Sequence, residues 1–266
     1  MRTSVQKKIA AGIGLLILAP ALAACGATAS STSTASTTST APATSTAPAT
    51  TTTVDDATAT CATGEEVDTS GTSASDAGRQ AEGAYSSGDL VAALAWAQVA
   101  ADGGDARGAR ILGIIDLEGL CTDADPAAAL VALQAATDGG DMKAPRYLGR
   151  IYVEGLGVTA DAATGAAYYS TGVERGDVSS MIALADLYVA GSGVDQDYAA
   201  ALDLYTRAAE RADHVGAAAM TGLGHLYEQG LGVPVDLAAA ADWYAQAIAA
   251  GDTAAQADLD RVLAAQ

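Results

Sequence analysis

The pattern of apolar and polar positions divides the chain into three parts. An apolar run from Ile9 to Leu22 follows three basic residues, and residues 26–60 are almost wholly Ser, Thr, Ala and Pro. From about Ser73 onward the sequence is rich in alanine and is interrupted at regular intervals by Gly and Asp. Alanine favours helix because it loses no side-chain entropy there. We therefore expect the helices in this last part.

The interruptions in the alanine-rich part recur at a fixed spacing. One set of glycines is separated by 36, 36 and 39 residues, and each is followed six residues later by an aspartate. The pairs are Gly119 and Asp125, Gly155 and Asp161, Gly191 and Asp197, and Gly230 and Asp236. Asp89 lies 36 residues before Asp125, so the same pattern starts five times. A period of this length is typical of stacked helical repeats.

Each aspartate of this set predicts a helix start. Its carboxylate can accept hydrogen bonds from the backbone N–H groups of the first turn, and its negative charge is attracted to the positive end of the helix dipole. Pro126, directly after Asp125, fits the first helical position. Fifteen residues after each start comes a second turn, in which a small residue precedes an acid. The small residue is glycine at four of the five turns, and glycine suits a left-handed helix end. These turns are Gly104-Asp105, Gly140-Asp141, Gly176-Asp177, Ala212-Asp213 and Gly251-Asp252.

The pattern within each unit therefore predicts, in this order, a helix A, a glycine turn, a helix B and a Gly-Asp turn. The three extra residues of the fourth unit are expected in a loop at 214–216, and residues 253–265 are expected to form a capping helix. The predicted fold class is all-α. It is an α/α solenoid of about five helical hairpins over residues 73–266, with a C-terminal capping helix and a concave face lined mainly by the A helices.

Three of the units carry a more specific motif. Residues 148–158 read LGRIYVEGLGV, residues 223–233 read LGHLYEQGLGV, and residues 184–194 read LADLYVAGSGV. These segments resemble the Sel-one-like repeat (SLR), a relative of the tetratricopeptide repeat, and the resemblance covers about residues 80–255. The unit around Leu112 departs from the pattern, with Asp116 at the tyrosine position and Cys121 where the other units carry a loop glycine.

The repeat pattern assigns the glycines and aromatic residues of the motif to the scaffold. Gly149 and Gly224 are expected to permit close helix packing, and Tyr152, Tyr188 and Tyr227 to pack inside their units. The aromatic residues of the B helices are interpreted as core or groove-filling residues: Trp96, Tyr168, Tyr169, Tyr205, Trp243 and Tyr244.

The start of the chain has the layout of a bacterial lipoprotein signal. Residues 1–24 carry a basic segment, an apolar run too short to span a bilayer, and small residues before Cys25. Leu22-Ala23-Ala24-Cys25 resembles a lipobox, which implies cleavage before Cys25 and lipidation of its thiol. The alternative is an ordinary signal peptide that ends near a cysteine. Residues 25–72 are predicted to be the lipidated cysteine and a disordered stalk, because a Ser/Thr/Ala/Pro-rich segment cannot bury a core.

Charge limits the classes of partner. The chain has 13 basic and 32 acidic residues, and removing Arg2, Lys7 and Lys8 leaves a net charge of −22. Nucleic acid and anionic membrane surface are not expected as partners, because both need a basic protein surface. The expected contact with a membrane is through the lipid anchor only.

The cysteines suggest one cross-link. Lipidation of Cys25 leaves Cys61 and Cys121, which can form a disulfide in an exported protein. The replacement of a loop glycine by Cys121 favours this interpretation. Two unrelated thiols remain the alternative, since the sequence gives no distance between them.

Five cations form a predicted basic ladder between residues 107 and 150. Arg107 with Lys143, and Arg110 with Arg146, are each 36 residues apart and so occupy equivalent sites on neighbouring A helices, and Arg150 lies one turn beyond Arg146. Such a ladder, near helix N-termini, could bind a carboxylate, an acidic peptide or a phosphate. In the alternative interpretation these cations are solvated or neutralise the acids of the Gly-Asp turns, Asp105 and Asp141.

A second polar group is predicted further along the A helices. Asp186 and His225 occupy equivalent positions, and Glu228 lies one turn from His225. We expect the three to line the groove and contact a partner. They lack a third metal ligand of convincing spacing, so no metal site is predicted. The sequence also contains no established catalytic motif outside the signal, so no catalytic residue and no cofactor are predicted.

The function predicted from this sequence is that of a non-catalytic scaffold. Members of the SLR family mostly hold other proteins, and the resemblance implies a protein or peptide partner, an acidic one included, at the extracytoplasmic face of the cell membrane. One alternative is a cell-wall or β-lactam hydrolase, a role implied by exported relatives of the repeat. A second alternative is a spacer or surface antigen without a specific groove.

The lipid anchor can be tested by one substitution. Cys25→Ser removes the thiol that would take the lipid, so the protein is expected in the soluble fraction or as an uncleaved precursor. Fractionation with immunoblotting measures this, and a variant that stays in the membrane at mature size would contradict the anchor.

Overall fold

The computed structural model describes residues 67–121, 123–211 and 213–266, and this part of the chain is all helical. The A helices are α1 (Ala74–Ser87), α3 (Ala106–Glu118), α5 (Ala144–Glu154), α7 (Val178–Ala190) and α9 (His214–Gln229). The B helices are α2 (Leu90–Asp102), α4 (Pro126–Asp138), α6 (Ala162–Glu174), α8 (Tyr198–Ala209) and α10 (Leu237–Ala249). A short 3-10 helix, η2 (Thr253–Ala255), and α11 (Gln256–Ala264) follow. The predicted solenoid of helical hairpins with a capping helix is confirmed.

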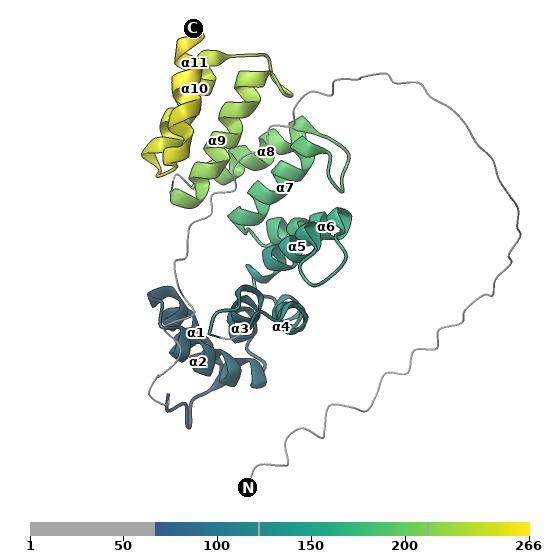
Figure 1. Ribbon diagram of the computed structural model, residues 1–266, viewed down its shortest axis with the longest axis vertical. Helices are drawn as coiled ribbons and strands as arrows, with labels where there is room; N and C mark the ends of the chain where they lie inside the picture. The colour runs from purple at the N-terminus through teal and green to yellow at the C-terminus, as the bar shows by residue number, and fades with distance from the viewer. Residues whose placement is uncertain (1–66, 122, 212) are drawn as a thin grey trace, which may run out of the picture. The chain divides into compact units, whose positions relative to one another are not determined.

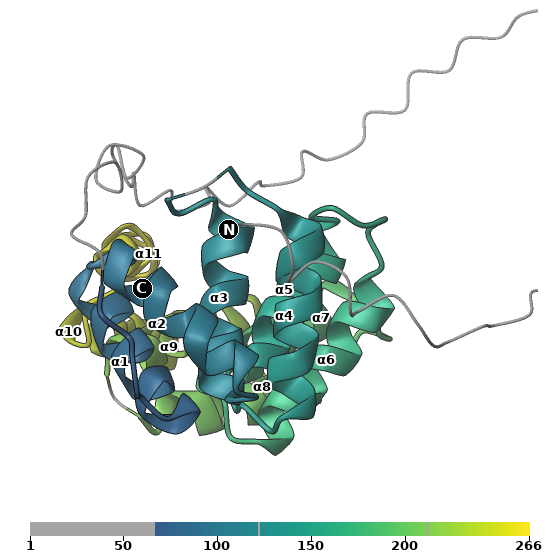
Figure 2. The same cartoon turned by 90° about the horizontal axis from the view of Figure 1, so that it is seen from below.

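The helices pack as hairpins that are stacked along the chain. Each A helix packs on the B helix that follows it, and α11 packs on α10. Figure 1 shows the hairpins in chain order, and Figure 2 shows α4 beside α5. Neighbouring A helices also contact one another in the pairs α1 with α3, α5 with α7, and α7 with α9. The A helices therefore share a face within two groups, α1 with α3 and α5 with α7 and α9, while contacts between α3 and α5 are fewer.

Aspartates begin the helices, as the sequence predicts. Asp89, Asp125, Asp161, Asp197 and Asp236 each accept backbone N–H bonds from the first turn of a B helix. The acids of the second turn accept backbone N–H groups at the starts of α3, α5, α7, α9 and η2, whereas Ser73 caps α1. These acids are Asp105, Asp141, Asp177, Asp213 and Asp252. One residue type thus satisfies the exposed N–H groups at both helix starts of a unit.

Glycines provide the left-handed turns between these helices. The residues that end α3, α5, α7 and α9 have φ between 65° and 72°, and Gly104, Gly140 and Gly176 have φ between 80° and 85°. Cys121 also has a positive φ, 69°, which matches Gly157 at 69° and Gly193 at 70°. Cys121 therefore keeps the backbone shape of the loop glycine it replaces, although a side chain disfavours that shape.

The insertion in the fourth unit does not form a loop. Residues 214–216 are the first residues of α9, which has 16 residues where α7 has 13. The Asp213 carboxylate accepts hydrogen bonds from the backbone N–H groups of Val215 and Gly216. Asp213 therefore caps a helix that begins at His214. The three additional residues lengthen the helix by about one turn.

Tyrosines from the B helices fill the space between the helices. Tyr169, Tyr205 and Tyr244 are 8%, 4% and 0% exposed, and burial raises the pKa of Tyr169 to about 12. A Cβ atom built on Gly149 would lie 2.5 Å from the Tyr169 ring, and one on Gly224 would lie 2.4 Å from the Tyr244 ring. The glycines of the motif therefore admit the tyrosine rings, as the sequence analysis expects.

The other aromatic residues of the motif are partly buried. Tyr152 stacks on Tyr168 with ring centroids 5.6 Å apart. The remaining members pack against the apolar clusters as partly buried side chains: Trp96, Tyr188, Tyr227 and Trp243. Their expected role in the scaffold agrees with these positions.

The close approach of Gly224 to Tyr244 gives a stability prediction. Gly224→Ala should lower the free energy of unfolding by roughly 1 to 3 kcal/mol, because its Cβ overlaps a ring that is fully buried. Gly83→Ala is the control, since Gly83 is an exposed helical glycine whose Cβ would meet nothing within 4 Å. That control should raise stability by about 0.5 to 1 kcal/mol through helix propensity. Urea unfolding followed by circular dichroism measures both, and equal effects would contradict the packing.

Candidate partner-binding surfaces

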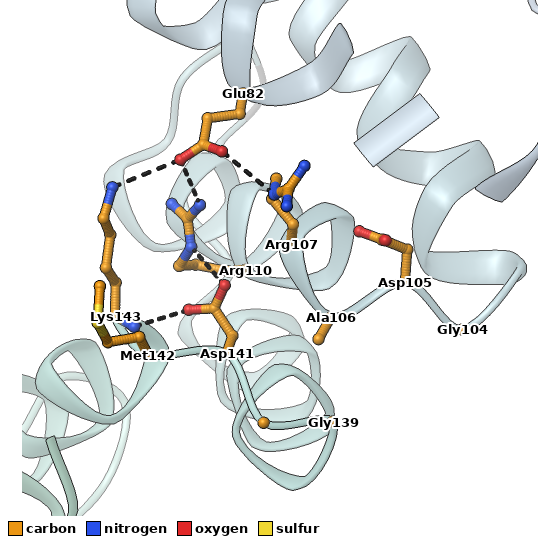
Figure 3. A pocket seen from close by; sticks show the side chains of 11 residues that line it. Glu82, Gly104, Asp105, Ala106, Arg107, Arg110, Gly139, Asp141, Met142 and Lys143 are labelled. Carbon is orange, nitrogen blue, oxygen red and sulfur yellow. Dashed lines mark hydrogen bonds and ion pairs between the residues drawn. The ribbon is translucent and has the colours of Figure 1, made fainter. Parts of the chain in front are cut away.

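The predicted basic ladder begins in a set of ion pairs, the Glu82 cluster, which consists of Glu82, Arg107, Arg110, Asp141 and Lys143. The Glu82 carboxylate lies 3.2 Å from Arg107, 3.0 Å from Arg110 and 3.4 Å from Lys143. The Arg110 guanidinium also donates to Asp141 at 3.1 Å. Figure 3 shows how these side chains converge from α1, α3 and the turn before α5.

Arg110 is the buried centre of the Glu82 cluster. Its side chain is 5% exposed, while those of Arg107 and Lys143 are 39% and 41% exposed and line a cavity of about 630 Å³. A buried guanidinium needs paired carboxylates, and Arg110 has two, from α1 and from the turn before α5. The cluster thus links the first hairpin to the third across α3.

The three cations change the titration of Glu82. Desolvation alone would raise the pKa of the Glu82 carboxyl, but the charges of Arg110, Lys143 and Arg107 lower it below its ordinary value. The charged form of Glu82 is therefore favoured in the fold, and an acidic ligand at this cavity would compete with Glu82 for the same cations.

The other two members of the ladder also have partners within the chain. Arg146 donates to Tyr147 at 2.6 Å and to Ser179 at 3.1 Å, and it lies 3.5 Å from Asp177. Arg150 forms an ion pair with Glu118 on α3. All five ladder residues thus pair with carboxylates of the chain. Arg110 does so with Asp141, as the alternative interpretation expects, whereas Arg107 pairs with Glu82 rather than Asp105.

A second cavity, the C-terminal cavity, lies between α7, α8 and α9. Its volume is about 220 Å³, and two of the three predicted polar residues, Asp186 and His225, line it. Asp186 accepts a hydrogen bond from the Tyr205 hydroxyl. Desolvation of its carboxyl raises the pKa of Asp186, and the hydrogen bond from Tyr205 and the nearby His225 oppose this shift. His225 is 42% exposed, lies 3.4 Å from Asp258, and meets the edge of the Tyr244 ring.

The third predicted residue, Glu228, instead attaches the capping helix. It accepts a 2.7 Å hydrogen bond from Tyr244, and both of its oxygens accept hydrogen bonds from Arg261 on α11. The hydrogen bonds from Arg261 are the main cause of a lowered pKa at the Glu228 carboxyl. The structure therefore places Asp186 and His225 together at one cavity and Glu228 in a separate contact.

Two residues that organise these surfaces were not among the predicted site residues: Glu82, and Tyr205, which was assigned to the scaffold. The signal for both was present in the repeat register. Glu82, Glu118 and Glu154 recur every 36 residues on the A helices, which is the same spacing that relates the cations of the ladder. Tyr205 follows Asp186 by 19 residues, the same offset that separates Tyr244 from His225.

Several predictions fall on residues that the structure does not describe. The signal segment, Cys25, Cys61 and most of the stalk lie outside the described residues. Cys121 is not a free thiol in the structure, and its pairing with Cys61 stays a prediction. Within the described ranges, no group of three or more His, Cys, Asp or Glu residues could hold a metal ion. None of the helices in those ranges is long and apolar enough to cross a membrane.

Comparison with known families assigns the repeats. A family model for the Sel1 repeat matches residues 77–105, 145–177, 178–213 and 217–252, which is half of the chain. The chain belongs to the Sel1 repeat family. Sel1 repeats generally mediate protein–protein interactions and are typically non-enzymatic. A search of curated proteins finds no match.

Two solved structures with this fold are similar to the chain. One is a protective antigen of uropathogenic Escherichia coli strains with an SLR fold, at 27% identity and a TM-score of 0.60. That match covers 71% of this chain and 41% of the antigen, so this chain spans less than half of its length. The other is a Sel1 repeat protein from Oxalobacter formigenes, at 26% identity and a TM-score of 0.60, covering 68% of this chain and 75% of that one.

The divergent Sel1 unit coincides with the Glu82 cluster. The family model leaves residues 106–144 unmatched, and these residues contain α3, α4, Cys121 and four of the five cluster members. The unit still forms a capped hairpin of the same kind. The unit that departs from the Sel1 motif is therefore also a unit whose arginines form ion pairs with a neighbouring unit.

Glu82→Gln tests the cluster. The folded-state pKa of Glu82 is lowered, so its contribution to stability is present above the ordinary pKa of about 4.5 and is lost as pH falls through the lowered value. The substitution should cost about 1 kcal/mol at pH 7, a figure discounted for solvent exposure, and less at pH 3. Urea unfolding of the full chain at both pH values measures this.

A matched control is Asp203→Asn. Asp203 pairs with Arg207 one turn away, and both side chains are exposed, so the loss should be at most about 0.5 kcal/mol. A Glu82→Gln variant as stable at pH 7 as this control would show that the cluster adds nothing to the fold.

Proposed function

We propose that this protein is a membrane-anchored lipoprotein that holds a partner protein on the face formed by its A helices, outside the cytoplasm. The observation that carries the proposal is the contact between successive A helices, which brings the exposed side chains of several units onto one face. A face built this way can contact an extended segment over several units, as solenoids commonly do.

The lipid anchor of the proposal rests on the sequence. The lipobox-like segment at residues 22–25 would place the chain at the cell membrane, and the Ser/Thr/Ala/Pro-rich residues that follow would hold the repeats away from the surface. A Cys61–Cys121 disulfide would tie the beginning of the repeats to the second unit. The anchor and the disulfide together would determine where the A-helix face is held relative to the membrane.

The charges of the described residues favour the C-terminal cavity over the Glu82 cluster as the contact. An acidic partner at the cluster would have to displace Glu82 from three cations. At the C-terminal cavity no such internal ion pair has to be broken at Asp186. A hydrolase remains the alternative. His225 contacts Asp258 and the Tyr244 ring, and neither contact supplies a serine or cysteine nucleophile for hydrolysis.

Crosslinking and affinity capture of the lipidated full chain from its native membrane tests the scaffold function. A specific captured protein should appear with the wild type, and Gln229→Trp should lower its recovery several-fold, because Gln229 is exposed and lines the C-terminal cavity. Val131→Trp is the control, since Val131 lies on a B helix and is 71% exposed. This control should capture as the wild type does.

Two outcomes would contradict the proposal. One is the absence of any protein recovered above background, and the other is an equal loss in the two tryptophan variants. Turnover of a labelled β-lactam or of peptidoglycan fragments, abolished by His225→Ala, would instead support the hydrolase.

A further inference from the structure

The carboxylate of Asp186 differs from the charged groups at the equivalent positions of neighbouring units. Arg150, one unit before, is paired with Glu118, and His225, one unit after, lies against Asp258. In the part of the chain that the structure describes, Asp186 forms no ion pair with Lys or Arg. Its hydrogen bond from Tyr205 leaves lone pairs of the carboxylate available at the cavity.

The position of this carboxylate is fixed by the packing behind it. Tyr205 is only 4% exposed, and a Cβ atom on Gly222 would lie 2.7 Å from its ring, so the absence of a side chain at Gly222 admits the ring. The Tyr205 hydroxyl donates to Asp186, and both residues line the cavity. An acceptor held in place in this way loses little freedom when it binds a ligand.

The rest of the lining is mostly aliphatic, although the His225 side chain also borders the cavity. Val189, Leu226 and Leu231 contribute aliphatic surface, and Gln229 adds an amide at the edge. The volume of about 220 Å³ suits one side chain rather than a stretch of backbone. An aliphatic wall with one carboxylate at its end is complementary to a long side chain whose stem is apolar and whose tip is cationic.

We propose that the C-terminal cavity binds a lysine or arginine side chain of the partner protein, with the aliphatic stem against Val189 and Leu226 and the charged tip at Asp186. This inference rests on the proposed scaffold function and names the chemistry of its partner. The overall charge supports it, because a chain with 32 acidic and 13 basic residues attracts a basic segment.

The direct test is an NMR titration of the full chain, labelled with ¹⁵N, with N-acetyl-lysine methylamide. Shifts are expected at the backbone amides of Gly222 and Gln229, and the matched norleucine compound should give much weaker ones. Asp186→Asn should weaken binding of the lysine compound about tenfold, since it removes the charge and keeps the acceptor for Tyr205.

Asp242→Asn is the control for the loss of one negative charge. Asp242 is exposed on α10 and does not line the cavity, so binding should change less than about twofold, as expected for a screened distant charge. Equal binding of the lysine and norleucine compounds, or an equal effect of the two Asn substitutions, would overturn the inference.

The native partner separates this inference from the scaffold function. Asp186→Asn should reduce capture of that partner from the membrane, while Asp242→Asn should not. Unchanged capture by Asp186→Asn would reject the cation pocket and leave the scaffold function in place. No captured partner for the wild type would reject the scaffold function itself.

Discussion

An aspartate carboxylate accepts backbone N–H groups at the start of every helix from α2 to α10, and this interaction determines the architecture of the repeats. Asp125 and Asp161 each accept hydrogen bonds from two backbone N–H groups, and Asp141 and Asp177 accept backbone N–H groups at the starts of the A helices of the next units, α5 and α7. The caps fix where each helix starts, and the left-handed glycines fix where the A helices end. Short alanine-rich helices then pack on their neighbours in each unit, with α9 about one turn longer than α7, and the A helices form the A-helix face.

Because caps and turns are local, the fold could be predicted from the sequence. The spacing of Gly119, Gly155 and Gly191 gave the units and their helix ends, and Gly149 marked a close helix contact that the Tyr169 ring fills. The same reasoning placed residues 214–216 wrongly. Residues 214–216 were expected to form a loop, whereas Asp213 caps α9 and these residues form its first turn.

The candidate sites were less predictable because their partners are distant in sequence. Lys143 pairs with Glu82, 61 residues away, and repeat spacing relates like positions without showing which opposite charges meet. Cations that look like a free ladder are therefore parts of the scaffold. Asp186 and His225 do meet at one cavity, since both stand on A helices in contact, but the role of Tyr205 depends on packing that the motif alone does not specify.

The central claim is that partners bind the A-helix face and not the B helices. The most direct measurement is site-specific photo-crosslinking in cells, with a photoreactive amino acid in place of Val189 on α7 or in place of Val131 on α4. Val189 lines the C-terminal cavity, whereas Val131 is an exposed residue of a B helix. We expect an adduct with a specific protein from position 189 and none from position 131. An adduct from position 131 alone would contradict it.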